Sequence, residues 1–220
     1  NFAGRATALK WESENIPAIM QVWFGSECAD ALADVLFGDV APQGKLTVSM
    51  PQSTGQLPLY YNHLPTGRPV PEGADRYVNF ASNYLDVRND ALYPFGYGLS
   101  YTTFDYSDLI LSADSMPADG SVTATVTVTN TGNCDATEIV QLYIRDRQAS
   151  VSRPVKELKG FQRVPLRKGE SKQVTFTITP DLLKFYNYDL QHVLEPGTFD
   201  IMVGPNSAAS SLRTAALEVR

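Results

Sequence analysis

A change in sequence character near residue 105 constrains the fold of this 220-residue chain more than any other feature. From there to the C-terminus, short runs of alternating apolar and polar residues follow one another. The clearest run alternates four small apolar residues with four threonines: Val122, Ala124, Val126 and Val128 with Thr123, Thr125, Thr127 and Thr129. A period of two gives a strand one apolar and one polar face, so this run predicts a half-buried β-strand.

The same alternation recurs at Val140–Ile144, Val174–Ile178 and Phe199–Val203. Turn-forming residues separate the runs, at 130–133, 167–170, 195–197 and 204–206. About seven or eight short strands in roughly 110 residues predict an immunoglobulin-like β-sandwich. The Cys–Trp–Cys spacing of immunoglobulin domains is not found in the sequence, which favours the fibronectin type III-like version.

The N-terminal part has a different pattern, typical of an α/β segment. The nearly continuous apolar run Ile16–Phe24 predicts a strand buried on both faces, and Lys45–Met50 predicts a second strand. One strand–helix–strand unit is too small to enclose its own core, so this segment is expected to be partial. The fold class predicted for the whole chain is therefore α+β.

A helix is expected between these two strands. Ser26 is placed to cap it, and Glu27 and Asp30 lie in its first turn, where carboxylates favour the helix dipole. Apolar residues at 28, 31, 32, 35 and 36 form one helical stripe, and Gly38 follows at the C-terminal end.

Residues 51–104 are rich in proline, glycine and aromatic residues and show little periodicity. Disordered segments are poor in aromatic residues, so we expect an ordered arm that covers a neighbouring surface. The expected division is therefore 1–50 for the partial α/β segment, 51–104 for the arm and 105–220 for the sandwich.

Composition excludes several classes of partner and cofactor. A net charge of −6 disfavours nucleic-acid binding, and no apolar stretch approaches the roughly 20 residues of a membrane span.

The two cysteines, Cys28 and Cys134, are too few for a disulfide framework or a zinc knuckle, and nothing in their local sequence demands a bridge between them. The opening residues lack a charged stretch followed by an apolar one, so no signal peptide is expected in them.

Acidic residues offer the most direct candidates for chemistry. Glu12 and Glu14 would share one face of a strand and resemble the pair of carboxylates about 5–5.5 Å apart in retaining glycosidases. A solvated loop is the alternative, and we favour it. Asp30 with Asp34, and the oxygen-bearing residues among 86–90, could approach a cation, but neither set has the spacing of a dedicated site.

Other motifs are less specific. His63 and His192 neighbour neither a cysteine nor a second histidine, so no metal is expected, and Ser100 is not in a G-x-S-x-G elbow. Five aromatic residues could form a sugar-stacking platform or simply pack in a core or an interface: Trp23, Tyr60, Tyr61, Tyr77 and Tyr84.

Four stretches together carry a family resemblance. They are WFGSECADALADVLFGDVAPQGKLTVSMPQSTGQLPLYYNH, TGRP, ALYPFGYGLSYTTF and SVSRPVKELKGFQRVPLRKGES, in this order. The chain from Asn1 to Arg220 resembles the C-terminal third of bacterial glycoside hydrolase family 3 β-glucosidases. The block Leu92–Phe104 is the most distinctive, because it joins the family's α/β sandwich domain to its fibronectin type III-like domain.

The resemblance implies a retaining hydrolase in which an aspartate nucleophile lies in an N-terminal (β/α)₈ barrel and a glutamate serves as acid/base. No position in this chain matches either motif, so the resemblance assigns it no catalytic residue, no metal and no cofactor. It implies a secreted or periplasmic parent enzyme acting on β-linked glucosides or oligosaccharides, with upstream catalytic domains as partners. Arg68, Arg76 and Tyr77 are the arm residues expected nearest the substrate, with packing against those domains as the alternative role.

Two further expectations follow. A stand-alone carbohydrate-binding or adhesive module is the competing function, and it would use exposed aromatic residues such as Tyr186 and Tyr188. The apolar run at 16–24 and the helical stripe at 28–36 would be left partly uncovered, so self-association is expected for the isolated chain.

Overall fold

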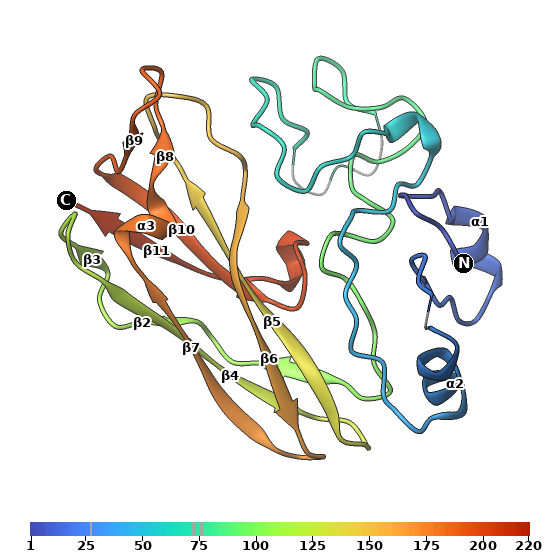
Figure 1. Cartoon of the computed structure of the whole chain (residues 1–220). Helices are drawn as coiled ribbons and strands as arrows, with labels where there is room; N and C mark the ends of the chain where they lie inside the picture. The colour runs from blue at the N-terminus through green and yellow to red at the C-terminus, as the bar shows by residue number, and fades with distance from the viewer. Residues whose placement is uncertain (27, 72–73, 75–76) are drawn as a thin grey trace. The chain divides into compact units, whose positions relative to one another are not determined.

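The computed structural model describes residues 1–26, 28–71, 74 and 77–220, and these form two compact units (Figure 1). The N-terminal unit comprises Asn1–Val40, Lys45–Tyr61 and Thr66–Tyr97, and the sandwich unit comprises Ala41–Gly44, Asn62–Pro65 and Gly98–Arg220. A search of the described residues for a helix long and apolar enough to cross a membrane found none.

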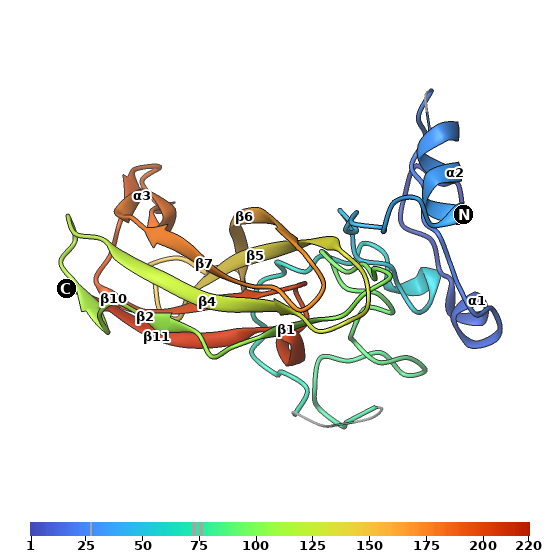
Figure 2. The same ribbon diagram turned by 90° about the horizontal axis from the view of Figure 1, so that it is seen from below.

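Two β-sheets build the sandwich unit (Figure 2). The five-stranded sheet has the order β3 (Ser115–Met116), β11 (Arg213–Val219), β10 (Gly197–Gly204), β5 (Ala136–Asp146) and β6 (Glu157–Leu166). In the other sheet, β4 pairs with three strands: β1 (Phe104–Tyr106), β2 (Ile110–Leu111) and β7 (Ser171–Ile178); β4 itself is Val122–Asn130. All strand pairs are antiparallel except β11 with β3. The predicted fibronectin type III-like sandwich is confirmed.

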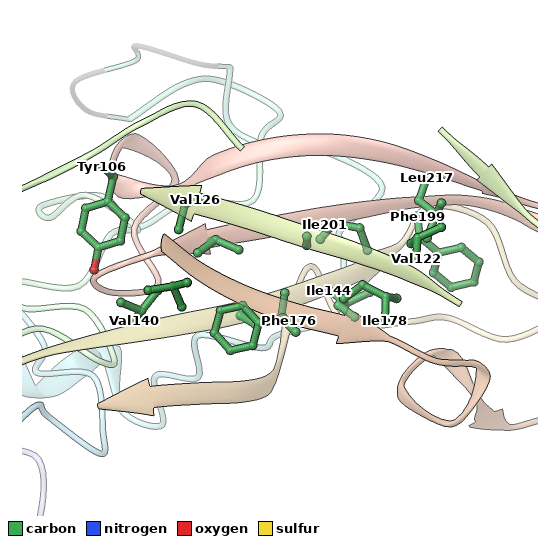
Figure 3. Packing of buried hydrophobic residues seen from close by; sticks show 14 of the residues in the cluster. Tyr106, Val122, Val126, Val140, Ile144, Phe176, Ile178, Phe199, Ile201 and Leu217 are labelled. Carbon is green, nitrogen blue, oxygen red and sulfur yellow. The ribbon is translucent and has the colours of Figure 1, made fainter. Parts of the chain in front are cut away.

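The core lies between the inner faces of these two sheets, as Figure 3 shows. Along β4, buried and half-buried residues alternate without exception, so its valines face inward and its threonines face outward. Val126 of β4, Phe176 of β7 and Ile201 of β10 are each at most 8% exposed. Burial of one such side chain contributes about 1.5–3 kcal/mol, so the alternation seen in the sequence supplies most of this unit's driving force.

Short elements complete the sandwich unit. They are α3 (Pro180–Leu183), the hairpin of β8 (Phe185–Tyr186) with β9 (His192–Val193), and the 3₁₀ turn η2 (Ala209–Ser211). The predicted turn at 167–170 joins β6 to β7, and its Gly169 has φ +75°, a left-handed conformation that favours glycine.

The N-terminal unit contains two helices, α1 (Lys10–Asn15) and α2 (Ala29–Phe37), and the 3₁₀ turn η1 (Thr54–Gln56). The predicted helix corresponds to α2, and Gly38 ends it in the left-handed conformation with φ 86°. The expected cap at Ser26 is wrong: Cys28 precedes the helix, and no side chain caps it. Glu27, expected in the first turn, lies outside the described residues.

The two strands predicted beside this helix are not strands. Val22 makes one isolated bridge with Phe2, and Met50 makes one with Tyr93. A β-ladder needs consecutive bridges along a neighbouring strand, and within the described part of the chain each run makes one isolated bridge together with a few further backbone hydrogen bonds. Nor is the first run buried on both faces, since Ile16 is 43% and Phe24 77% exposed.

Two buried side chains, Met50 and Gln56, anchor the described residues of the proline-rich stretch that lie near them. Gln56, 1% exposed, accepts hydrogen bonds from the backbone amides of Gln52 (2.6 Å) and Ser53 (3.3 Å), and its amide donates to the carbonyl of Arg88 (2.7 Å). Met50, fully buried, donates its backbone N–H to the carbonyl of Tyr93 at 2.8 Å. These contacts fix a non-repetitive backbone that no period in the sequence specifies.

Candidate functional site

The acidic pair that most suggested catalysis does not form. Glu12 and Glu14 lie on helix α1, not on a strand as the same-face argument required. Residues two apart on an α-helix point about 200° away from each other, so these carboxylates cannot converge on one bond. That they have no catalytic role stays a prediction.

The candidate cation ligands are engaged in other contacts or face solvent. Asp30 and Asp34 are exposed on α2. In the loop at 86–90, the amide of Asn89 donates to the carbonyl of Ser82 (2.7 Å), and Asp90 pairs with Arg88 (2.5 Å). Within the described ranges, no three His, Cys, Asp or Glu side chains gather as a metal site would require.

The arm residues expected near a substrate are solvent-facing where the structure describes them. Arg68 is exposed; its backbone N–H donates to the hydroxyl of Thr66 (3.2 Å), and its carbonyl accepts from the amide of Ser82 (2.7 Å). Tyr77 is 50% exposed. Arg76 lies outside the described residues. The backbone at Arg68 is therefore anchored while its guanidinium remains accessible.

The five aromatic residues that could form a platform or pack in a core make different contacts. Tyr61 stacks on Phe95, with ring centroids 4.2 Å apart, and the hydroxyl of Tyr84 donates to the carbonyl of Gln56 (3.4 Å). Tyr60 is 63% exposed. Packing, the commoner use of such residues, accounts for Tyr61 and Tyr84.

Neither histidine has a metal-site environment. The Nδ1 atom of His63 lies 2.9 Å from the carbonyl of Leu64, and the ring of His192 stacks on Tyr186. Ser100 has a buried hydroxyl with no hydrogen-bond partner among the described residues. Cys28 and Cys134 are free thiols.

A second aromatic surface lies on the β8–β9 hairpin. Tyr186 and His192 face each other across the two strands, with ring centroids 4.8 Å apart and an interplanar angle of 27°. The side chain of Asn187 holds the turn, because its oxygen accepts from the amides of Asp189 (3.0 Å) and Gln191 (2.9 Å). Tyr186 is 65% exposed and Tyr188 is 92% exposed, as the sequence suggested, whereas the histidine's part in the stack was missed.

A charged depression on the five-stranded sheet was also missed. It is lined by Arg145, Arg147, Gln148 and Thr198. The guanidinium of Arg147 donates twice to the same oxygen of Asp200, at 2.6 and 3.0 Å. These residues come from β5 and the segment after it and from β10, which lies about 50 positions later in the sequence. No local sequence motif therefore predicts the depression.

The comparisons with known families match both units in order. Residues 1–101 match the family described as "Glycosyl hydrolase family 3 C-terminal domain", and residues 138–207 match the family described as "Fibronectin type III-like domain".

Individual relatives agree with these matches. The chain is 51% identical over 207 residues to a "Periplasmic beta-glucosidase" of Salmonella typhimurium, covering 93% of this chain and 27% of the relative. It is 44% identical over 218 residues to a "Beta-xylosidase" of Formosa agariphila, covering 99% of this chain and 29% of the relative. A crystal structure of a β-glucosidase from Listeria innocua in complex with glucose superimposes with a TM-score of 0.89 at 41% identity, over 99% of this chain and 30% of that one.

The chain thus spans between a quarter and a third of the length of these relatives. Their names describe hydrolases of glucosides and xylosides, and the family matched by residues 1–101 is described as a C-terminal domain. The two domain matches and the long alignments lead to one assignment: the chain belongs to glycoside hydrolase family 3 and corresponds to the C-terminal region of its members.

Proposed function

We propose that this chain is the supporting C-terminal region of a retaining β-glucosidase, and that the catalytic carboxylates belong to residues preceding Asn1. The observation that carries the proposal is the ordered pair of domain matches within relatives three to four times as long. The divergence of Glu12 and Glu14 on α1 supports it, because the acidic pair that the sequence suggested for catalysis does not converge.

The supporting role proposed for this chain is to hold the domains of the enzyme in position. In this proposal residues 1–50 complete an α/β domain, residues 51–104 form an arm and residues 105–220 form the terminal module. The buried anchors Gln56 and Met50 give the arm a defined shape. A rigid arm would help to hold domains in the pose that reaction needs when reacting groups come from different domains, where small displacements cost large factors in rate.

Arg68, Arg76 and Tyr77 remain our candidates for the substrate side of the arm. The exposed guanidinium of Arg68 on an anchored backbone supports this role. The full-length β-glucosidase of which this chain is proposed to be the C-terminal region is called the longer protein. In it, Arg68→Ala should raise KM for a β-glucoside several-fold. The charge-matched Arg167→Ala, in the turn between β6 and β7, should not. Equal KM values for the two variants would assign Arg68 to packing.

The names of the relatives support a substrate class and a location for the longer protein. β-Linked glucosides or oligosaccharides are proposed as substrates, because the first relative is named a β-glucosidase and a related crystal structure holds glucose. A periplasmic or secreted location for the longer protein is supported by the name of the Salmonella relative. Fractionation of cells expressing the longer protein tests it: enzyme retained with cytoplasmic markers would refute this location.

A chromogenic β-glucoside assay tests the central proposal. The 220-residue chain should release no chromophore above the rate without protein, whereas the longer protein should turn over. The Glu12→Gln, Glu14→Gln double variant of the longer protein should keep its rate. Hydrolysis by the isolated chain would overturn the assignment of the catalytic residues.

A second candidate function, carbohydrate binding by the sandwich unit, rests on the Tyr186–His192 stack. One face of Tyr186 is covered by the imidazole, and the residue remains 65% exposed, so a pyranose ring can reach it. Calorimetric titration with β-linked gluco-oligosaccharides should then show heat that Tyr186→Ala abolishes and Phe161→Ala preserves. Phe161 is a fair control because it is 62% exposed on another strand, and flat titrations would remove this function.

A further inference from the structure

The outer face of the five-stranded sheet carries the depression described above. Ile144 of β5 and Phe199 and Ile201 of β10 point into the core, so the alternate residues Arg145, Thr198 and Asp200 project from the opposite face. Arg145 stands directly opposite Asp200 in the strand register. The natural partner of Arg145 would therefore be this carboxylate.

The carboxylate of Asp200 forms its ion pair with a different arginine. Arg147 binds Asp200 through both Nε and Nη2, and the Asp200 side chain is only 13% exposed. The side chain of the half-buried Arg145, in contrast, makes no hydrogen bond or ion pair with any residue in the described part of the chain. The guanidinium of Arg145 has five N–H donors, and inside the depression they lack a protein acceptor.

A third cation adds to the excess of positive charge near Arg145. Lys156, which precedes β6, donates from Nζ to the carbonyl of Ser207 at 2.8 Å. Burial and, secondarily, the charge of Arg145 lower the pKa of Lys156, so the two cations are close enough to repel. Asp146 does not relieve the repulsion, because it belongs to the inward-facing set of β5 and its carboxylate accepts the amide of Gln148 at 3.1 Å.

We propose that this depression binds a small oxyanion, with Arg145 as the main ligand and Arg147, Gln148 and Thr198 lining the site. Three cations, Arg145, Arg147 and Lys156, lie on this face with two carboxylates, Asp200, which is paired with Arg147, and the exposed Glu218, which stands opposite Thr198 in the strand register, in a chain whose net charge is −6. A planar guanidinium fork matches the paired oxygens of a carboxylate, sulfate or phosphate, and a bound anion would remove the repulsion between Arg145 and Lys156. The ligand is either a carboxylate carried by a sugar, as in a uronate, or a free inorganic anion.

The test is an NMR titration of the full 220-residue chain at constant ionic strength, with sodium chloride as the balancing salt. Sodium sulfate and sodium glucuronate are added separately, with glucose as the neutral counterpart. We expect saturable shifts of the backbone amides at 145–148 and 198. Saturation by glucuronate and not by glucose identifies a sugar carboxylate, and saturation by sulfate alone identifies an inorganic anion.

Substitutions test whether Arg145 is the main ligand of the anion. Arg145→Gln should weaken the saturable binding about tenfold, the usual effect of losing one charge-assisted hydrogen-bond donor group, whereas Arg167→Gln should leave it unchanged. Circular dichroism melts check that both variants fold, and Thr198→Val provides a second probe of the site. Shifts that stay linear in anion concentration, or equal affinities for wild type and Arg145→Gln, would overturn the proposal.

Discussion

At the scale of single residues, a few buried polar side chains hold segments that lack regular structure. Gln56 joins η1 to the loop at 88–90 through hydrogen bonds in both directions, and it is almost completely buried. In the sandwich unit, the hydroxyl of Tyr106 donates to the buried carboxylate of Glu138 at 3.2 Å. Buried polar groups of this kind are costly to leave unpaired, so their removal should be visible in stability.

Replacing Gln56 with leucine tests the first of these contacts. The change leaves the amides of Gln52 and Ser53 and the carbonyl of Arg88 without this partner, so we expect a loss of about 2–3 kcal/mol in the stability of the N-terminal unit. Hydrogen exchange should accelerate at residues 52–57 and 88–93. The control Gln173→Leu, on an exposed face of β7, should leave exchange there unchanged, and equal protection in both variants would contradict the role of Gln56.

The Tyr106–Glu138 contact predicts an alkaline dependence of stability. Burial, and then the neighbouring Glu138, raises the pKa of the Tyr106 phenol far above its ordinary value of about 10. A raised pKa in the folded state means that the stabilising contribution is complete below about pH 10 and is lost as the pH rises above it, because the unfolded chain loses the proton first. The free energy of unfolding should therefore fall above pH 10.

Tyr106→Phe isolates this effect. The variant should lose about 1.5–3 kcal/mol at pH 7, since a hydrogen bond to a carboxylate is removed, and its stability should fall less steeply with pH above 10 than that of the wild type. Urea unfolding at pH 7 and at pH 9.5–11 measures both quantities. Parallel pH profiles for the two proteins would show that Tyr106 is not the group responsible.

At the scale of elements, sequence patterns predicted the strands whose burial is regular. Burial alternates strictly in β4 and β7, which is typical of a half-buried strand, whereas β5 and β10 were predicted from an alternating part of their sequence and also contain runs of consecutive buried residues. β6 was not singled out, because it contains Gly160, Pro165 and the 62% exposed Phe161, which obscure its period. The run at 16–24 looked like a strand by composition, but strand formation depends on a partner that local sequence cannot provide.

Candidate sites were less predictable than strands, for a related reason. The separation of Glu12 from Glu14 depends on the local backbone: the sequence left a strand and the favoured solvated loop open, and the structure has a helix there. The pairing of Arg147 with Asp200 and the isolation of Arg145 depend on the register between β5 and β10. Register is set by the whole sheet, so neither feature could be read from a local motif.

The exposed apolar face of α2 carries a prediction at this scale. Leu36 is 68% and Phe37 84% exposed at the end of the helix, and apolar surface of this kind drives association. The isolated chain should show concentration-dependent mass by light scattering, and Leu36→Ser with Phe37→Ser should shift it toward the monomer. Leu190→Ser, 81% exposed on the β8–β9 hairpin, is the matched control and should have no effect. A wild-type chain that stays monomeric at all concentrations and binds no hydrophobic dye would contradict this prediction.

At the scale of the whole molecule, the chain combines one unit with an extensive core and one with little buried apolar surface. The main core cluster belongs entirely to the sandwich unit, whereas the buried hydrophobic residues of the N-terminal unit are Leu9 and Met50 among those described. This contrast suits a region whose N-terminal part packs against further structure and whose C-terminal part folds on its own core. It agrees with the proposed division of function, in which this chain supports and residues preceding Asn1 catalyse, while the two domain matches carry that proposal.

Covalent trapping tests this division most directly. A retaining enzyme forms a glycosyl–enzyme intermediate, which a 2-deoxy-2-fluoroglucoside with a good leaving group causes to accumulate. Intact-mass measurement should show one added sugar on the longer protein and none on the 220-residue chain, and peptide mapping should place the label on a residue preceding Asn1. A label on any residue between Asn1 and Arg220 would contradict the account.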